Sequence, residues 1–153
     1  MAELRDMLNE LGFQNVQTYI QSGNIILDSE ETKEIVCQKI KEAIAAKFGY
    51  DVPVLARTPN EWKSTLENYP FSQENEKIVA FTFLDTVTKE TTIEVKGIND
   101  DRYKIVDDVV YLHCPSGFGK TKLTNSVIEK KLKATATTRN LKTTKKLLEL
   151  ATS

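Results

Sequence analysis

Apolar and polar positions in the first part of the chain follow helical and strand periods in turn. Leu4, Leu8 and Leu11 recur at helical spacing before Gly12, which is typical of a helix end. Two β-rich runs then flank a short polar turn, the pattern of a hairpin. A broad apolar stripe follows, ending at Gly49. The pattern predicts a helix, a hairpin, a helix and a strand at residues 3–11, 16–20 with 24–28, 31–48 and 51–57.

The second part of the chain repeats the mixture of periods after a short helix expected at 61–68. Pro70 and the polar stretch 72–76 are the best boundary in the sequence. Strands are expected at 78–84, 103–106 and 109–113, the last two as a hairpin around Asp107 and Asp108. Helices are expected at 88–98, 121–132 and 141–151, with a short extended segment at 134–138. We therefore predict two units, residues 1–70 and residues 71–153, the second with a carboxy-terminal helix.

Both element orders fit the β-α-β-β-α-β plan, in which two helices cover one face of an antiparallel sheet. We expect an α+β fold of two ferredoxin-like halves with antiparallel sheets. The first half lacks its opening strand, because the chain starts inside the first helix. Such a strand lies in the middle of the sheet, so its loss leaves unpaired backbone groups. Either the chain is truncated at its amino end or something else fills the gap, and self-association through the sheet gap is one way to do so.

Composition indicates a globular chain with no membrane span. Of 153 residues, 40% are hydrophobic and 28% are charged. No apolar run approaches the roughly 18 residues that cross a bilayer, and we expect no leader segment. We expect a cytoplasmic protein without contact to the membrane. Cys37 and Cys114 lack a CxxC spacing, so the sequence predicts no metal site, no disulfide and no cofactor.

Charge is divided unevenly along the chain. Residues 117–153 carry nine basic and two acidic residues, whereas residues 1–116 carry twelve basic and twenty acidic ones. A basic segment on an acidic body attracts polyanions locally, so residues 117–146 are a candidate contact for nucleic acid or a phosphorylated ligand. The equally weighted alternative is a solvated lysine face that meets the acidic part of the same chain.

A glycine-rich basic loop is the first candidate site. It follows an apolar strand and is expected to open a helix, whose first N–H groups and dipole favour an anion. The candidate anion-binding residues of the loop are Gly117, Gly119, Lys120 and Lys122. The alternative is that the glycines only permit the turn. A phosphate-binding loop of the nucleotide-hydrolysing kind is not predicted, because Cys114 replaces its first glycine and Pro115 removes an N–H donor.

Arg139 is the best single anchor for an anion, because a planar guanidinium binds phosphate or carboxylate through two hydrogen bonds. It has an equally weighted structural alternative, a pairing with an acidic side chain, with its neighbour Asn140 as the N-cap of the last helix. The polar residues of the turn at 21–24 have a structural alternative as well, because their side chains can satisfy local backbone groups. The other polar candidates are Gln21, Ser22, Asn24, Asn125 and Asn140.

Several strings together resemble one bacterial family. They are Tyr19-Ile20-Gln21-Ser22-Gly23-Asn24, Gly117-Phe118-Gly119-Lys120-Thr121-Lys122-Leu123-Thr124-Asn125, Ile128-Glu129-Lys130-Lys131-Leu132 and Ala136-Thr137-Thr138-Arg139-Asn140. In combination they are similar to the family of domain of unknown function 1697, over nearly the whole chain. The resemblance implies two plait-like halves, usually opened by a strand and a glycine turn that this chain lacks. It implies no established activity, and no catalytic residue can be carried over.

Taken together, the residues favour a non-catalytic binding protein for an anionic partner. The competing hypotheses are an enzyme with a site between the two halves, built from Ser22, Asn24, Lys120 and Arg139, and a structural or oligomerising module. The binding hypothesis requires binding that depends on salt. The enzyme hypothesis requires a pocket in which those side chains converge, and the structural module requires self-association.

Overall fold

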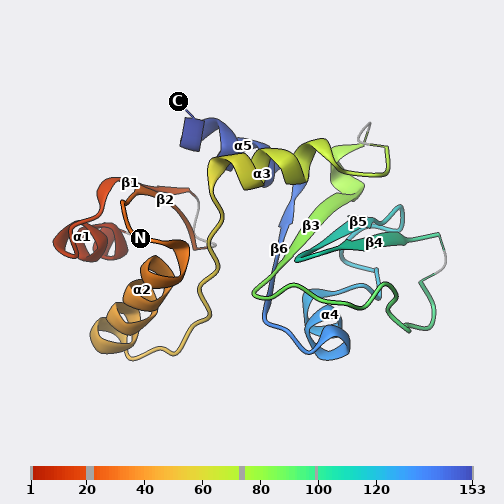
Figure 1. The fold of residues 1–153 in the computed structure, drawn as a ribbon. Helices are drawn as coiled ribbons and strands as arrows, with labels where there is room; N and C mark the ends of the chain where they lie inside the picture. The colour runs from red at the N-terminus through yellow and green to blue at the C-terminus, as the bar shows by residue number, and fades with distance from the viewer. Residues whose placement is uncertain (1, 20–22, 73–74, 99, 153) are drawn as a thin grey trace. The chain divides into compact units, whose positions relative to one another are not determined.

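The computed structural model describes residues 2–19, 23–72, 75–98 and 100–152 and divides the chain into two compact units (Figure 1). One unit comprises Met1–Trp62 with Leu147–Ser153, and the other comprises Lys63–Lys146. The domain limits at residues 70 and 71 stay a prediction. The elements are α1 (Ala2–Glu10), β1 (Gln14–Tyr19), β2 (Asn24–Asp28), α2 (Lys33–Phe48), α3 (Pro59–Glu67), a 3-10 turn (Glu76–Ile78), β3 (Val79–Leu84), β4 (Arg102–Val106), β5 (Val109–His113), α4 (Asn125–Leu132), β6 (Ala136–Asn140) and α5 (Leu141–Thr152).

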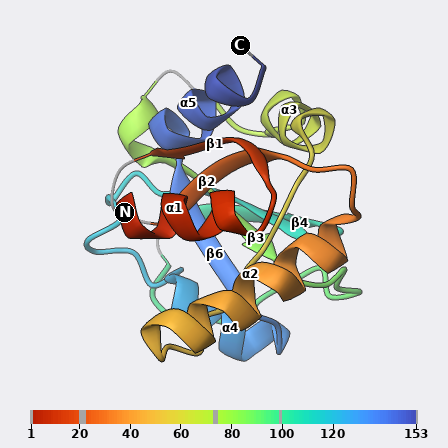
Figure 2. The same cartoon turned by 90° about the vertical axis from the view of Figure 1, so that its left-hand side faces the viewer.

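The first unit contains the antiparallel hairpin β1–β2 and the helices α1 and α2, with end segments of α3 and α5 (Figure 2). Its apolar cluster takes Met7 and Leu8 from α1 and Val36 and Ile40 from α2, with Ile25 of β2 packed against it. Local signals set the limits of α2. The Thr32 side chain accepts a hydrogen bond from the Ile35 N–H, and Gly49 ends the helix at φ 74°. The predicted helices and hairpin are confirmed here.

The strand predicted at 51–57 is wrong. These residues form no strand and pair with no strand in the described part of the chain. Val54 is half-buried and packs against the cluster of the first unit. A strand needs a neighbouring backbone to share its hydrogen bonds, and these residues lack one in the described structure.

The second unit contains a four-stranded sheet of order β4-β5-β3-β6, and every neighbouring pair in it is antiparallel. Alternate residues of the sheet, including Ala80, Val110 and Leu112, face an apolar core completed by Ile128 and Leu132 of α4. The predicted strands of this unit are confirmed, and so is an α+β fold with antiparallel sheets. The ferredoxin-like classification of the two halves stays a prediction.

The helix predicted at 88–98 is wrong, because those residues have no regular secondary structure. The hydroxyl group of Tyr103 accepts a hydrogen bond from the Ile93 N–H (2.7 Å) and donates one to the Ile93 carbonyl (3.1 Å). Ile93 is buried in the core of the second unit, and Val95 packs against that core. A tyrosine hydroxyl from the sheet thus satisfies backbone groups that a helix would have paired internally.

The opposite face of this sheet is aromatic. Tyr69, Phe81 and Tyr111 pack with ring centroids 5.4 to 6.0 Å apart. The hydroxyl group of Tyr69 donates to the Leu112 carbonyl at 2.7 Å. All six residues of β3 are buried as a result, so this strand is covered on both faces. The aromatic side chains here are core and are closed to a stacking ligand.

Candidate functional site

The glycine-rich loop does not open a helix directly, contrary to the prediction of a helix at 121–132. Helix α4 begins at Asn125, where the Thr124 side chain caps it by accepting a hydrogen bond from the Val127 N–H. The hydroxyl oxygen of Thr121 accepts from the Leu123 N–H at 3.1 Å, which holds the chain in a local turn before the helix. Threonine side chains compete with the helix for backbone donors, and this delays its start.

A carboxylate from the residue before β4 also binds this loop. Asp101, only 4% exposed, accepts hydrogen bonds from the Ser116 hydroxyl (2.9 Å to each oxygen) and from the Ser116 N–H (3.4 Å). The N–H groups of Gly117, Lys120 and Thr121 donate to carbonyls within the loop. Much of the hydrogen-bonding capacity that an external anion would need is therefore used inside the chain.

Cys114 stands at the start of this loop and is fully buried. Burial raises its pKa to about 11, a hydrogen bond with Thr121 opposes the rise, and the charge of Asp101 adds to it. A thiol that stays protonated near neutral pH is a poor nucleophile, so Cys114 has the character of a core residue.

The lysines of the loop lie outside its hydrogen-bonded turn. Lys120 and Lys122 are exposed, and the stem of Lys122 lies over Gly97, where a Cβ would be 3.9 Å from the Lys122 Cγ. Gly97 adopts φ 77°, which a glycine tolerates without strain. Lys122 is thereby placed beside the turn that contains Lys96.

Arg139 and Asn125 are tied to strand β6. The guanidinium of Arg139 is half-buried and donates to the Thr138 carbonyl at 3.0 Å, and burial lowers its pKa. Asn125 donates to the Ala136 carbonyl at 3.0 Å and accepts from the Thr138 hydroxyl at 2.9 Å. Both amide atoms of Asn125 thus fasten α4 to β6.

The remaining candidates lie at element ends. The Asn140 side chain accepts a hydrogen bond from the Thr143 N–H at 2.8 Å, which fits the N-cap interpretation. Asn24 belongs to the first unit, is buried and donates to the Tyr19 carbonyl across the hairpin. Gln21 and Ser22 lie outside the described residues.

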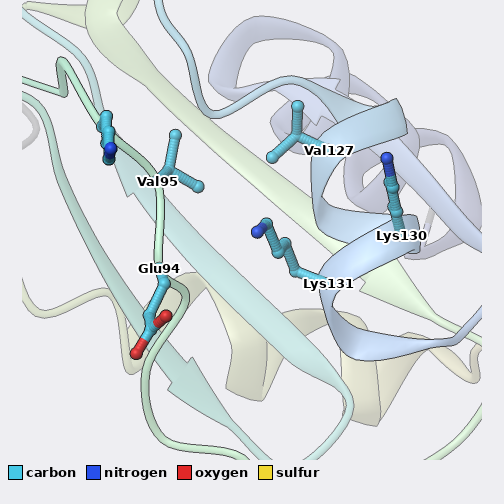
Figure 3. Close-up of a pocket in the computed structure, with 6 residues that line it drawn as sticks. Glu94, Val95, Val127, Lys130 and Lys131 are labelled. Atoms are coloured by element: carbon cyan, nitrogen blue, oxygen red, sulfur yellow. The ribbon is translucent and has the colours of Figure 1, made fainter.

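A groove of about 620 Å³ lies between the irregular segment 94–96 and helix α4 (Figure 3). We call it the α4 groove. The described residues that line it are Glu94, Val95, Lys96, Val127, Lys130 and Lys131.

Helical spacing explains the α4 wall of this groove. Val127, Lys130 and Lys131 stand at positions i, i+3 and i+4, which share one flank of a helix. The other flank faces β6, where the Glu129 carboxylate accepts a hydrogen bond from the Ala136 N–H at 2.9 Å. Glu129, the acidic residue of α4, therefore binds β6 on the flank away from the groove. The charged residues that α4 contributes to the groove are both lysines.

The charges of the lysines in the α4 groove are not balanced by ion pairs to residues that the structure describes. No ion pair between described residues includes Lys96, Lys130 or Lys131, and all three are exposed. In Figure 3, Lys131 reaches from α4 toward the 94–96 segment, and the carboxylate of Glu94 points away from the helix. The groove therefore presents three positive charges on a site whose one carboxylate faces elsewhere.

Sequence reasoning did not single out this groove. Lys130 and Lys131 belong to the predicted partner segment 117–146. The opposite wall of the groove, residues 94–96, is part of the helix predicted at 88–98, so the sequence predicts no groove there. The i, i+3, i+4 spacing of Val127, Lys130 and Lys131 is the signal that marks a shared flank.

Other classes of site have no counterpart in the part of the chain that the structure describes. Across residues 2–19, 23–72, 75–98 and 100–152, no cluster of three or more His, Cys, Asp or Glu side chains is placed to hold a metal ion. Nor is any described helix long and apolar enough to cross a membrane.

The fold defines the chain as a mixed α/β protein with antiparallel sheets, and comparison with known proteins places it in a family. Residues 1–111 match the family described as "Protein of unknown function (DUF1697)", so the chain belongs to this family. The family resemblance noted in the sequence is thereby confirmed. Three of the four strings that carried it lie beyond the matched residues.

A solved structure supports the fold. The chain is similar to a conserved bacterial protein from Streptococcus pneumoniae, with 22% identity and a TM-score of 0.65. The similarity covers 99% of this chain and 88% of the other. None of the curated proteins compared with the chain matches it.

Proposed function

We propose that the second unit is a non-catalytic binding module for an anionic partner, which it holds in the α4 groove. The observation that carries this proposal is the gathering of Lys96, Lys130 and Lys131 around one groove without an ion pair to a described residue. Lysines are point charges that suit phosphate groups, whether of a nucleic acid or of a small molecule. The described lining combines these lysines with two valines, which supports binding through charge and apolar contact.

This proposal moves the anion away from the residues that the sequence first indicated. At the 114–121 loop, an anion would meet the carboxylate of Asp101 and donors already bonded within the chain, whereas the carboxylate of Glu94 in the α4 groove points away from α4. Lys122 connects the two regions, because its stem lies over Gly97 beside Lys96. We include Lys122 as an outer contact of the same anion.

The proposed architecture of the second unit is a ferredoxin-like plait in which an irregular segment replaces the first helix. Its support is the strand order β4-β5-β3-β6 with antiparallel neighbours. Loss of that helix opens the space beside α4, and the 94–96 segment forms the wall in its place.

The test measures binding of a labelled single-stranded oligonucleotide and of inorganic phosphate over a salt series. We expect binding at low salt that weakens as salt rises. Lys96→Gln, Lys130→Gln and Lys131→Gln should each weaken it roughly two- to fivefold. Lys104→Gln is the matched control, since Lys104 is exposed on β4 and does not line the groove. Absence of binding to both probes, or binding that ignores salt, removes the proposal.

A further inference from the structure

The α4 groove is apolar where its two walls meet. In Figure 3, Val95 on the irregular segment and Val127 on α4 face each other across the groove. Both side chains are half-buried, and Val95 packs against the core formed by Ile93 and Ile128. The lysines stand around this apolar gap. A ligand that fills the groove therefore meets two chemistries, positive charge and hydrocarbon.

We infer that the ligand is a small amphiphilic anion, a phosphate monoester that carries a short aliphatic chain. Its phosphate lies among Lys96, Lys130 and Lys131, and its chain lies between Val95 and Val127. This inference rests on the proposed function and specifies its ligand. The volume of about 620 Å³ falls in the range of small-molecule sites, roughly 300 to 1,000 Å³.

The alternatives fit the groove less well. Single-stranded nucleic acid is held by bases stacked on aromatic side chains, and the described lining has none. Phe81 and Tyr111, on the other face of the sheet, are buried. Inorganic phosphate alone would leave the two valines without a role. A phosphate with a hydrocarbon chain matches both the lysines and the valines of the lining.

The experiment compares inorganic phosphate, butyl phosphate and hexyl phosphate by titration calorimetry at one ionic strength, using the whole chain. A fully buried methylene group is worth about a fourfold gain in affinity. In this open groove we expect a gain of at least about twofold per methylene until the valines are covered. Val95→Thr and Val127→Thr should each reduce the gain in affinity per added methylene. Val87→Thr is the control, because Val87 is 62% exposed and does not line the groove.

The outcomes separate this inference from the proposal beneath it. Equal binding of all three phosphates overturns the amphiphilic ligand and leaves anion binding in place. Tighter binding of an oligonucleotide, insensitive to both Val→Thr changes, also overturns it in favour of a polyanion. Capture by phosphatidic acid vesicles without binding of free hexyl phosphate overturns the free ligand in favour of a lipid surface. If no phosphate compound and no oligonucleotide binds, both the inference and the proposed function fall.

Discussion

The 114–121 loop and the α4 groove lie in the same unit and both carry lysines, but they use charge in opposite ways. The loop holds the buried carboxylate of Asp101, which accepts its Ser116 donors. The groove has three lysines for which the described structure offers no ion pair. A glycine-rich basic string is therefore a weak sign of an anion site until the acidic groups of the same chain are placed. The two regions differ in one respect: in the loop, the carboxylate of Asp101 already accepts the hydrogen bonds of Ser116.

Removal of Asp101 should have the largest effect. Asp101→Ala leaves the Ser116 donors without their charged acceptor, so we expect the free energy of unfolding to fall by about 2 to 3 kcal/mol. Urea unfolding measures this change. Asp100→Ala is the control, because Asp100 is the exposed neighbour. A loss equal to that of the control would mean that Asp101 does not hold the loop, and the comparison above would fail.

The buried thiol at the start of the loop should make stability depend on pH. The pKa of Cys114 is raised from 9.0 to about 11, so the folded state retains a proton that the unfolded state releases first. Its contribution is complete below pH 9 and is lost as pH rises toward 11, at up to about 1.4 kcal/mol per pH unit.

Urea unfolding at pH 8, 9 and 10 checks this dependence in the original chain and in Cys114→Ala. The variant should lose stability less steeply above pH 9, because it lacks the titrating thiol. Burial also raises the pKa of Tyr111, which gives both proteins a shared slope in the same direction. Parallel curves for the two proteins would show that Cys114 is not closed to solvent in the folded loop.

The start of α4 separates the loop from the helix, and a cap substitution tests its position. Thr124→Ala removes the acceptor of the Val127 N–H and should cost about 1 kcal/mol, whereas Thr124→Ser should restore most of it. Thermal or urea unfolding gives the values. Thr92→Ala, at an exposed residue of the irregular segment, is the control. If Thr124→Ala leaves the free energy of unfolding unchanged, Thr124 is not the N-cap, and the helix would start earlier, within the loop.

Lys122 should show the smallest effect and tells how far the groove extends. Lys122→Gln should weaken inorganic phosphate binding by up to about twofold, less than Lys131→Gln, because Lys122 reaches the site only beside Gly97. Titration of the two variants side by side compares them. If Lys122→Gln has the larger effect, the anion lies nearer the loop than the groove. The site predicted from the sequence at the glycine-rich loop would then be preferred.

Much of the fold could be predicted because its signals are local. Helix α2 lies between the cap at Thr32 and Gly49, and the β4–β5 hairpin turns at Asp107, which adopts φ 54°. Such limits depend on neighbouring residues alone, which is why the predicted positions agree with the structure. The errors at 51–57, 88–98 and 121–124 have different causes. At 51–57 the neighbouring strand is missing, and at 88–98 the Tyr103 hydroxyl binds the backbone, so partners outside the local pattern decide. At 121–124 the cause is local, because the Thr121 oxygen accepts the Leu123 N–H before the helix starts.

By itself, the sequence determined the family, the strands of the antiparallel sheet and the excess of lysine near the carboxy end. Tertiary structure alone decided which lysines face a groove and which region already contains an acid. The physical reason is that charge and apolar surface act through space. Asp101 reaches Ser116 because the sheet places β4 beside β5, and Val95 lies across the groove from Val127 where the irregular 88–98 segment is bonded to the Tyr103 hydroxyl.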